Sequence, residues 1–148
     1  MITVRDLAPA DRAAWQHLYA GYGEFYETPL GEEKADRVWA SLMDPAYEAF
    51  GLVAVDEDDR PIALAHYREF ARLLGDGSGI YLDDLFTAES ARGSGAASAL
   101  IARLEQLARE RGAGIVRWIT ASDNLTAQKL YDRVATKTSW LTYDLKVE

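Results

Sequence analysis

The stretch that decides the fold is Ile80-Tyr81-Leu82-Asp83-Asp84-Leu85-Phe86-Thr87, which resumes after four residues as Arg92-Gly93-Ser94-Gly95-Ala96-Ala97. An amphipathic segment with apolar residues at helical spacing follows it. This order predicts a strand, a glycine turn and a helix. Such a turn leaves backbone N–H groups free at the positive end of the helix dipole, which suits a phosphate group. We therefore predict a phosphorylated small molecule as the ligand.

The composition predicts a single cytoplasmic domain over residues 1–148. Hydrophobic residues make up 49% of the chain, enough for one core, yet no apolar run is long enough to cross a bilayer and no signal peptide follows Arg5. With no cysteine and two histidines, neither a disulfide nor a metal site is expected. The net charge of −8 disfavours nucleic acid as a partner.

The remaining elements follow from apolar periodicity and turn residues. From Ile80 to Val134 the predicted order is strand, helix, strand, helix, which implies neighbouring parallel strands joined by a right-handed crossover. Elsewhere we predict a strand at 2–5, a helix from Pro9, a helix at 32–43, strands at 51–55, 62–70 and 115–120, a helix capped near Asn124, and a strand at about 140–147.

The glycine turn does not match either of the two best-known nucleotide-binding motifs. The Gly-x-x-x-x-Gly-Lys run of a triphosphate loop is missing, and the third glycine of the dinucleotide motif is replaced by Ser98. About twenty residues further on, Glu110 lies inside a predicted helix rather than after a strand. Hydride chemistry is therefore disfavoured. A turn without any ligand is the remaining alternative, against which the flanking strand and helix argue.

Asp83 and Asp84 are candidate proton acceptors. Neighbouring residues on a regular strand point to opposite faces, so we expect one carboxylate to face the interior. Burial would raise its pKa and suit it to accept a proton from an amine. A solvated acid, or a salt bridge to Arg68 or Arg117, is the alternative. His66 is expected to be a satisfied polar residue of the core.

Together these segments resemble the GNAT superfamily of acetyl-coenzyme A dependent N-acetyltransferases. The pyrophosphate motif of that family is matched by Arg92, Gly95 and Ala97, and its second motif by Asn124, Ala127, Leu130 and Tyr131. The stretch Tyr81 to Thr87 is similar to the branch that contains diamine and polyamine acetyltransferases and fungal histone or D-amino-acid acetyltransferases. The resemblance implies an α+β, three-layer α/β/α fold, with a splayed mixed sheet of six or seven strands and helices on both faces.

The resemblance also implies a function, which is acetyl transfer from acetyl-CoA to a primary amine of a small cationic acceptor. The amine would attack the thioester directly, Asp83 or Asp84 would accept its proton, and Tyr131 would protonate the thiolate. Asn124 would contact the cofactor. Backbone groups of Leu85, Phe86 and Thr87 would hold the acetyl and pantetheine groups, and the pyrophosphate would lie on the amides of Arg92, Gly93, Ser94, Gly95, Ala96 and Ala97. No metal is implied.

The chain departs from the family pattern after the last helix. Members often have Gly-Phe there, whereas Val134-Ala135-Thr136 occupies this place. We therefore expect a reduced last hairpin, and the partner subunit of a homodimer could complete the acceptor site. A non-catalytic acyl-CoA sensor and a protein or peptide N-acetyltransferase are the alternative functions.

Overall fold

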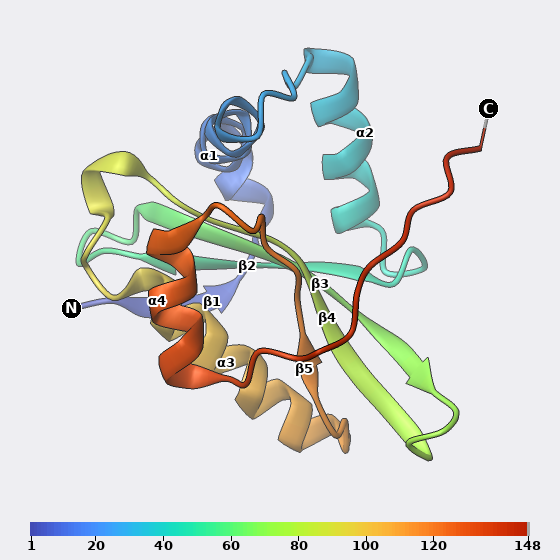
Figure 1. Ribbon diagram of the computed structural model, residues 1–148. Helices are drawn as coiled ribbons and strands as arrows, with labels where there is room; N and C mark the ends of the chain where they lie inside the picture. The colour runs from blue at the N-terminus through green and yellow to red at the C-terminus, as the bar shows by residue number, and fades with distance from the viewer. Residues whose placement is uncertain (148) are drawn as a thin grey trace. The chain divides into compact units, whose positions relative to one another are not determined.

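The computed structural model describes residues 1–147, which form two compact units: Met1–Trp118 and the segment from Ile119 onward. The first unit holds all five strands and three of the helices (Figure 1). Its elements are β1 (Thr3–Asp6), α1 (Arg12–Phe25), α2 (Glu32–Met43), β2 (Ala49–Val55), β3 (Pro61–Arg72), β4 (Gly77–Thr87), α3 (Ala96–Arg111) and β5 (Val116–Arg117), with 3-10 turns at η1 (Pro9–Asp11) and η2 (Glu89–Ala91). The second unit holds α4 (Leu125–Val134).

The strands form one mixed sheet in the order β1-β2-β3-β4-β5. The first four are antiparallel neighbours, and β4 and β5 run parallel, which confirms the predicted crossover through α3. Within residues 1–147, β5 pairs with β4 only at Ile80 and Tyr81. The carboxyl end of β4 therefore has a strand neighbour on one side only. In an antiparallel ladder alternate residues point their N–H and C=O groups away from the partner strand, so β4 presents such groups on its open side.

Helices cover both faces of this sheet, as predicted. Trp15 and Leu18 of α1 pack with Leu64 of β3 on one face, where α2 contributes Ala35. On the other face α3 contacts β1 to β5, and Arg111 of α3 lies over the Tyr67 ring. Figure 1 shows α1 and α2 above the sheet and α3 below it. The buried side chains of α3 recur at helical spacing: Ala96, Leu100, Ile101, Leu104, Leu107 and Ala108.

The sheet has five strands within residues 1–147, slightly fewer than the predicted number of about six or seven. The strand expected at 115–120 shortens to Val116–Arg117, and the segment 140–147 forms no strand in the described part of the chain. Alternating apolar residues give a segment strand propensity, but a strand exists only where a neighbouring backbone satisfies its hydrogen bonds. That neighbour is a property of the tertiary fold.

The second unit is organised around the start of α4. Asn124 occupies the N-cap position that the sequence predicts, and its side-chain oxygen accepts a hydrogen bond from the Ala127 amide (3.4 Å). The amide group of Gln128 donates to the carbonyls of Ala121 and Ser122 (3.0 and 3.1 Å), which ties the preceding loop to the helix. Tyr131 lies seven residues after Asn124, on the same side of the helix.

Candidate active site

A β-bulge in β4 brings the two candidate acids to the same face of the sheet. In the pairing with β3, His66 is opposite Asp84 and Tyr67 is opposite Leu82, so Asp83 is an extra residue. The Asp84 carboxylate contacts His66 and the Asp83 carboxylate contacts Arg68. His66 and Arg68 are two residues apart on a regular strand and share a face. The expectation of opposite faces is therefore wrong, because it assumed an unbroken strand.

Asp84 ends a buried chain of hydrogen bonds. The indole N–H of Trp15 donates to Nε2 of His66 (2.9 Å), and Nδ1 of His66 lies 2.8 Å from Oδ2 of Asp84. Because an indole can only donate, Nε2 must be the acceptor and the imidazole proton must be on Nδ1. His66 is 5% exposed, and both of its nitrogens are satisfied, as expected for a polar core residue. The neutral imidazole donates to Asp84 and fixes its orientation.

Asp83 forms an ion pair with Arg68. The Nε–H of Arg68 donates to both carboxylate oxygens of Asp83 at 3.2 and 3.1 Å. Burial raises the pKa of the Asp83 carboxyl, and the charge and hydrogen bonds of Arg68 oppose that rise. Of the alternatives left open by the sequence, the structure thus forms the salt bridge to Arg68. The guanidinium of Arg68 also lies over the Tyr81 ring, 4.6 Å from its centroid.

Two tyrosines of α1 complete this polar cluster. Tyr19 meets the His66 ring edge-on at 4.9 Å, and burial, followed by the charges of Asp84 and Asp83, raises its pKa to about 12. Burial and then Asp84 raise the pKa of Tyr22 well above its ordinary value. Both phenols therefore keep their protons at neutral pH. The sequence shows them only as part of an aromatic helix side, since nothing local indicates that β4 lies beside them.

The predicted pyrophosphate turn has the backbone expected of it. Gly93 and Gly95 adopt positive φ angles of 80° and 90°, where residues with a side chain are strained. A Cβ atom placed on either glycine would lie in open space. Gly95 is the N-cap of α3 and offers no side-chain cap, so the helix begins with uncapped N–H groups that have no intrahelical acceptor. This arrangement can take an anion close to the backbone.

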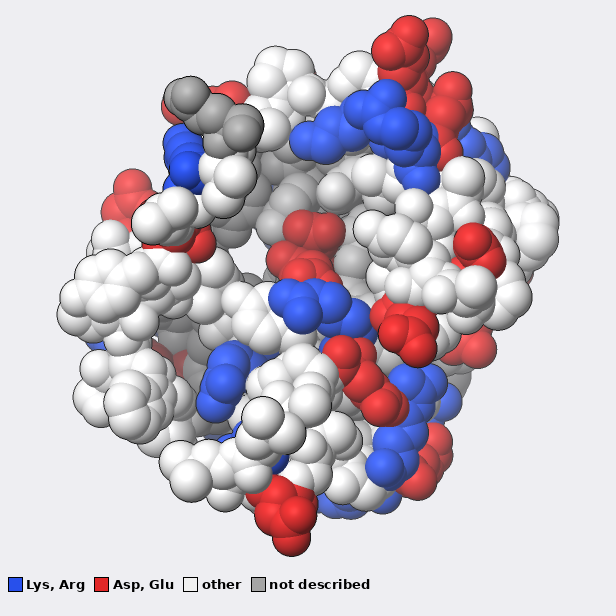
Figure 2. All heavy atoms as spheres, turned by 90° about the vertical axis from the view of Figure 1, so that its right-hand side faces the viewer, with Lys and Arg blue, Asp and Glu red and all other residues white. Residues whose placement is uncertain are grey.

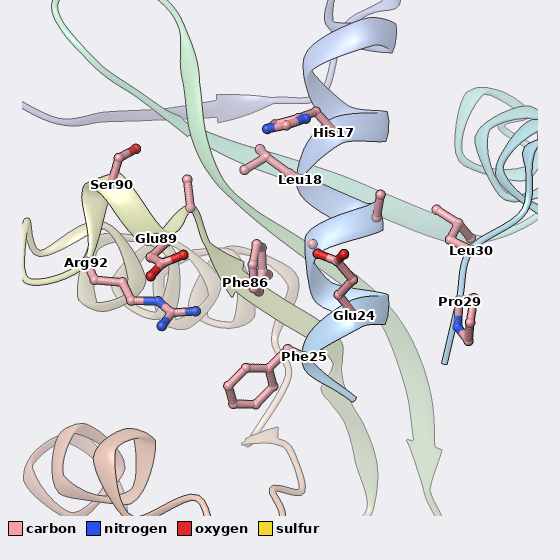
Figure 3. A pocket seen from close by; sticks show the side chains of 13 residues that line it. His17, Leu18, Glu24, Phe25, Pro29, Leu30, Phe86, Glu89, Ser90 and Arg92 are labelled. Atoms are coloured by element: carbon pink, nitrogen blue, oxygen red, sulfur yellow. The ribbon is translucent and has the colours of Figure 1, made fainter. Parts of the chain in front are cut away.

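A pocket of about 1090 Å³ lies between α1 and the segment that joins β4 to α3. Figure 3 shows Phe86 between α1 and the residues Glu89, Ser90 and Arg92. The Phe86 ring packs closely against Gly21, where an added Cβ would lie 2.9 Å from the ring. Further lining comes from His17, Leu18, Ala20, Glu24, Phe25, Pro29, Leu30 and Ala88.

The other predicted residues are distributed as follows. Leu85, Phe86 and Thr87 form the last three rungs between β4 and β3, on the strand end whose other side is open. Ala96 is buried, so only its backbone faces the turn. Arg92 lies with its guanidinium 5.9 Å from the centroid of the Phe25 ring. Asn124 and Tyr131 belong to the second unit, and their distance from the turn stays a matter of prediction.

Charges of both signs are distributed over the chain. Acidic residues outnumber basic ones by 24 to 16 in the chain. Figure 2 shows Lys and Arg interspersed with Asp and Glu on the face that is drawn. Among residues 1–147, no three His, Asp or Glu side chains gather in a way that could hold a metal ion. The helices within residues 1–147 are too short or too polar to span a bilayer.

Comparison with known proteins identifies the family of this chain. Residues 14–135 match the sequence model of the acetyltransferase (GNAT) family. The chain belongs to this family. It is 34% identical over 143 residues to the D-amino-acid N-acetyltransferase HPA3 of Saccharomyces cerevisiae, which covers 96% of this chain and 89% of the yeast protein. This GNAT member is accordingly an N-acetyltransferase, which confirms the predicted enzyme class.

Solved structures show the same fold. A probable acetyltransferase superposes with a TM-score of 0.87 at 24% identity, over 99% of this chain and 98% of the other. The ribosomal-protein-alanine N-acetyltransferase of Brucella melitensis biovar Abortus 2308 superposes with a TM-score of 0.84 at 20% identity, over 99% and 100% of the two chains. At such identities the likeness supports the three-layer fold alone.

Proposed function

We propose that this protein transfers an acetyl group from acetyl-CoA to a primary amine of a small acceptor that is cationic in solution. The observation that carries the proposal is the turn at Gly93 and Gly95. Both glycines have positive φ angles, both leave open space where a Cβ would be, and the second one starts an uncapped helix of 16 residues. A diphosphate needs such a close approach to backbone N–H groups.

Three parts of the chain would hold the cofactor: the glycine turn before α3, the start of α4 and the carboxyl end of β4. The amides from Arg92 to Ala97 would bind the pyrophosphate, and Asn124 would contact the cofactor from α4. The open side of β4 at Leu85, Phe86 and Thr87 would pair with the amide groups of the pantetheine arm. When bound, acetyl-CoA supplies a thioester whose carbonyl carbon can accept an amine without an acyl-enzyme.

Asp84 is the carboxylate best placed to take the proton of the amine. Asp83 is bound through both oxygens to Arg68, whereas Asp84 receives an oriented hydrogen bond from the neutral His66. An amine is a nucleophile only after it loses its proton, so a fixed carboxylate beside it, acting directly or through a water molecule, favours attack. A backbone N–H of β4 would stabilise the developing oxyanion, and Tyr131 would protonate the leaving thiolate.

The carboxylates of the site favour an acceptor whose amino group is positively charged in solution. Asp83 and Asp84 lie together on the α1 face, and Glu24 lines the neighbouring pocket. The amino group of a D-amino acid is one candidate, since the related yeast enzyme HPA3 is a D-amino-acid N-acetyltransferase. Polyamines share the required ammonium group.

A thiol-release assay with acetyl-CoA tests the proposal. The acceptors would be polyamines, free amino acids, aminoglycosides and basic peptides, and binding of coenzyme A would be measured by calorimetry in parallel. Turnover with a small amine is the expected result. Binding without turnover on any acceptor would instead favour the acyl-CoA sensor, and turnover on peptides alone would favour a peptide acetyltransferase. Failure to bind coenzyme A would refute the assignment of the glycine turn.

A further inference from the structure

Arg68 has an unused hydrogen-bonding edge beside the two carboxylates. Its Nε–H is directed at Asp83, while Nη1 and Nη2 donate to no protein acceptor within residues 1–147. The Arg68 side chain is 46% exposed, so a ligand in solvent can approach it. A guanidinium whose two terminal nitrogens are available presents two parallel N–H groups, which match the two oxygens of a carboxylate.

The Arg68 side chain is held in place from two directions. Asp83 binds its Nε–H through both oxygens, and the Tyr81 ring lies under the guanidinium at 4.6 Å. Fixing the group before a ligand arrives lowers the entropy that binding would otherwise cost. The bulge at Asp83 makes this possible, because it turns the Asp83 side chain toward Arg68.

This edge lies close to the proposed proton acceptor. Asp84 is directly opposite His66, and Arg68 is two residues from His66 on the same face of β3. Two residues along a strand span about 6.6 Å. In an α-amino acid one carbon separates the amino nitrogen from the carboxylate. A single molecule of that kind can therefore reach both Arg68 and Asp84.

We propose that the Nη1–Nη2 edge of Arg68 binds the α-carboxylate of a free amino acid, with its amino group facing Asp84. The inference rests on the proposed function and narrows its acceptor class from primary amines in general to α-amino acids. A polyamine has no group to offer this arginine. The subsite therefore discriminates by the presence of the carboxylate, independently of the acceptor's side chain.

The test pairs each amino acid with the amine that remains when its carboxylate is removed. The D- and L-enantiomers of alanine, phenylalanine and lysine would be compared with ethylamine, 2-phenylethylamine and cadaverine in the thiol-release assay. The variants are Arg68→Gln, which removes the guanidinium with its two parallel N–H groups, and Arg68→Lys, which keeps a positive charge beside Asp83. Arg72→Gln is the matched control, since Arg72 lies on the same strand four residues further along. Circular dichroism would verify that each variant is folded.

For Arg68→Gln we expect KM for the amino acids to rise about 10- to 100-fold, as for loss of a charge-assisted bidentate pair, with KM for the amines unchanged. For Arg68→Lys, KM for the amino acids should lie between the values for the wild type and Arg68→Gln. For Arg72→Gln, KM should equal the wild-type value. An equal effect on both acceptor classes, or no effect on either, would overturn the subsite.

Calorimetric binding of the same acceptors separates this inference from the proposed function. If no acceptor is turned over, amino-acid binding that Arg68→Gln abolishes still supports the subsite while the proposed function fails. If amines are acetylated and amino acids neither bind nor react, the proposed function stands and the subsite is wrong. Absence of any difference between Arg68→Gln and wild type in binding would also overturn it.

Discussion

Trp15 donates its indole N–H to Nε2 of His66 in the interior, across 2.9 Å, and so determines which nitrogen of the imidazole faces Asp84. His66 thereby acts as a positioning residue, whose effect on the reaction passes through the carboxylate. The link joins helix α1 to the strand that carries the candidate base. Both Trp15 and His66 are buried, so water cannot replace either partner easily.

Trp15→Phe should release this constraint. The variant leaves Nε2 of His66 without its donor, and we expect the free energy of unfolding to fall by about 1–3 kcal/mol, with a further loss from the smaller ring. Nitrogen-15 NMR of the imidazole should show Nδ1 protonated in the wild type and a mixture of tautomers in the variant. Trp39→Phe is the control, because Trp39 packs on Trp15 at 5.1 Å but donates no hydrogen bond to His66. An unchanged tautomer in Trp15→Phe would contradict the assignment.

Asp84→Asn should abolish proton transfer while preserving shape. We expect kcat to fall about 10²- to 10⁴-fold, the usual contribution of a positioned general base, with coenzyme A affinity unchanged. His66→Gln should lower kcat about 10- to 100-fold through loss of orientation alone. The measurement is steady-state kinetics on the best acceptor. A larger loss of kcat in Asp83→Asn than in Asp84→Asn would reverse the assignment of the base.

Asp83→Asn should change how stability depends on pH. Burial raises the pKa of Asp83 in the folded protein above its ordinary value of about 3.9. The folded state therefore holds this proton more tightly than the unfolded state, and the stabilisation that results is lost as the pH rises through the folded pKa. Relative to the variant, the wild type should lose free energy of unfolding as the pH rises from 3 to 7. Urea unfolding at a series of pH values measures this, and a wild type that gains stability relative to the variant contradicts it.

Gly95→Val should block cofactor binding without unfolding the protein. Valine at φ 90° is strained, and its side chain fills the open space that the pyrophosphate needs. Calorimetry should show coenzyme A affinity reduced at least about 100-fold, the loss expected when a ligand cannot approach the helix amides. Gly31→Val is the control, because Gly31 also precedes a helix and has open space but an ordinary φ of −75°. Normal affinity in a folded Gly95→Val protein would refute the cradle.

Tyr131→Phe should lower turnover and leave cofactor affinity nearly unchanged. Loss of the phenol removes the proton donor for the thiolate, and we expect kcat to fall about 100-fold, the lower end of the usual contribution of a general acid. Tyr47→Phe serves as the control, since Tyr47 is 61% exposed and far along the chain from the motifs. Unchanged kcat in Tyr131→Phe would assign this tyrosine to packing alone.

Part of the site was predictable because its signals are local. A glycine at positive φ needs no side chain, and apolar residues at helical spacing need one buried face, so Arg92 to Arg111 could be predicted as turn and helix. The helix at 32–43 was predicted with the bounds that the structure gives, since Pro45 lies just beyond its end.

The Trp15–His66–Asp84 chain was not predictable in the same way. Its members come from α1, β3 and β4, and each has an ordinary local reason to be where it is. The extra residue at Asp83 leaves no sequence mark either, because a bulge is a mismatch between two strands rather than a property of one. The prediction of a strand at 140–147 was wrong for the same reason. Its alternating apolar residues indicate a strand but do not identify the strand with which it would pair.

By itself, then, the sequence determined the strand, turn and helix around Ile80 to Arg111, their parallel return to Val116, and the family to which the pattern belongs. These features depend on backbone freedom and periodicity within a few residues of one another. Only the tertiary structure decided that Asp83 and Asp84 share a face, that His66 fixes one and Arg68 binds the other, and that five strands form the sheet. Those outcomes depend on the register between strands distant in the chain, which side-chain packing across the whole sheet selects.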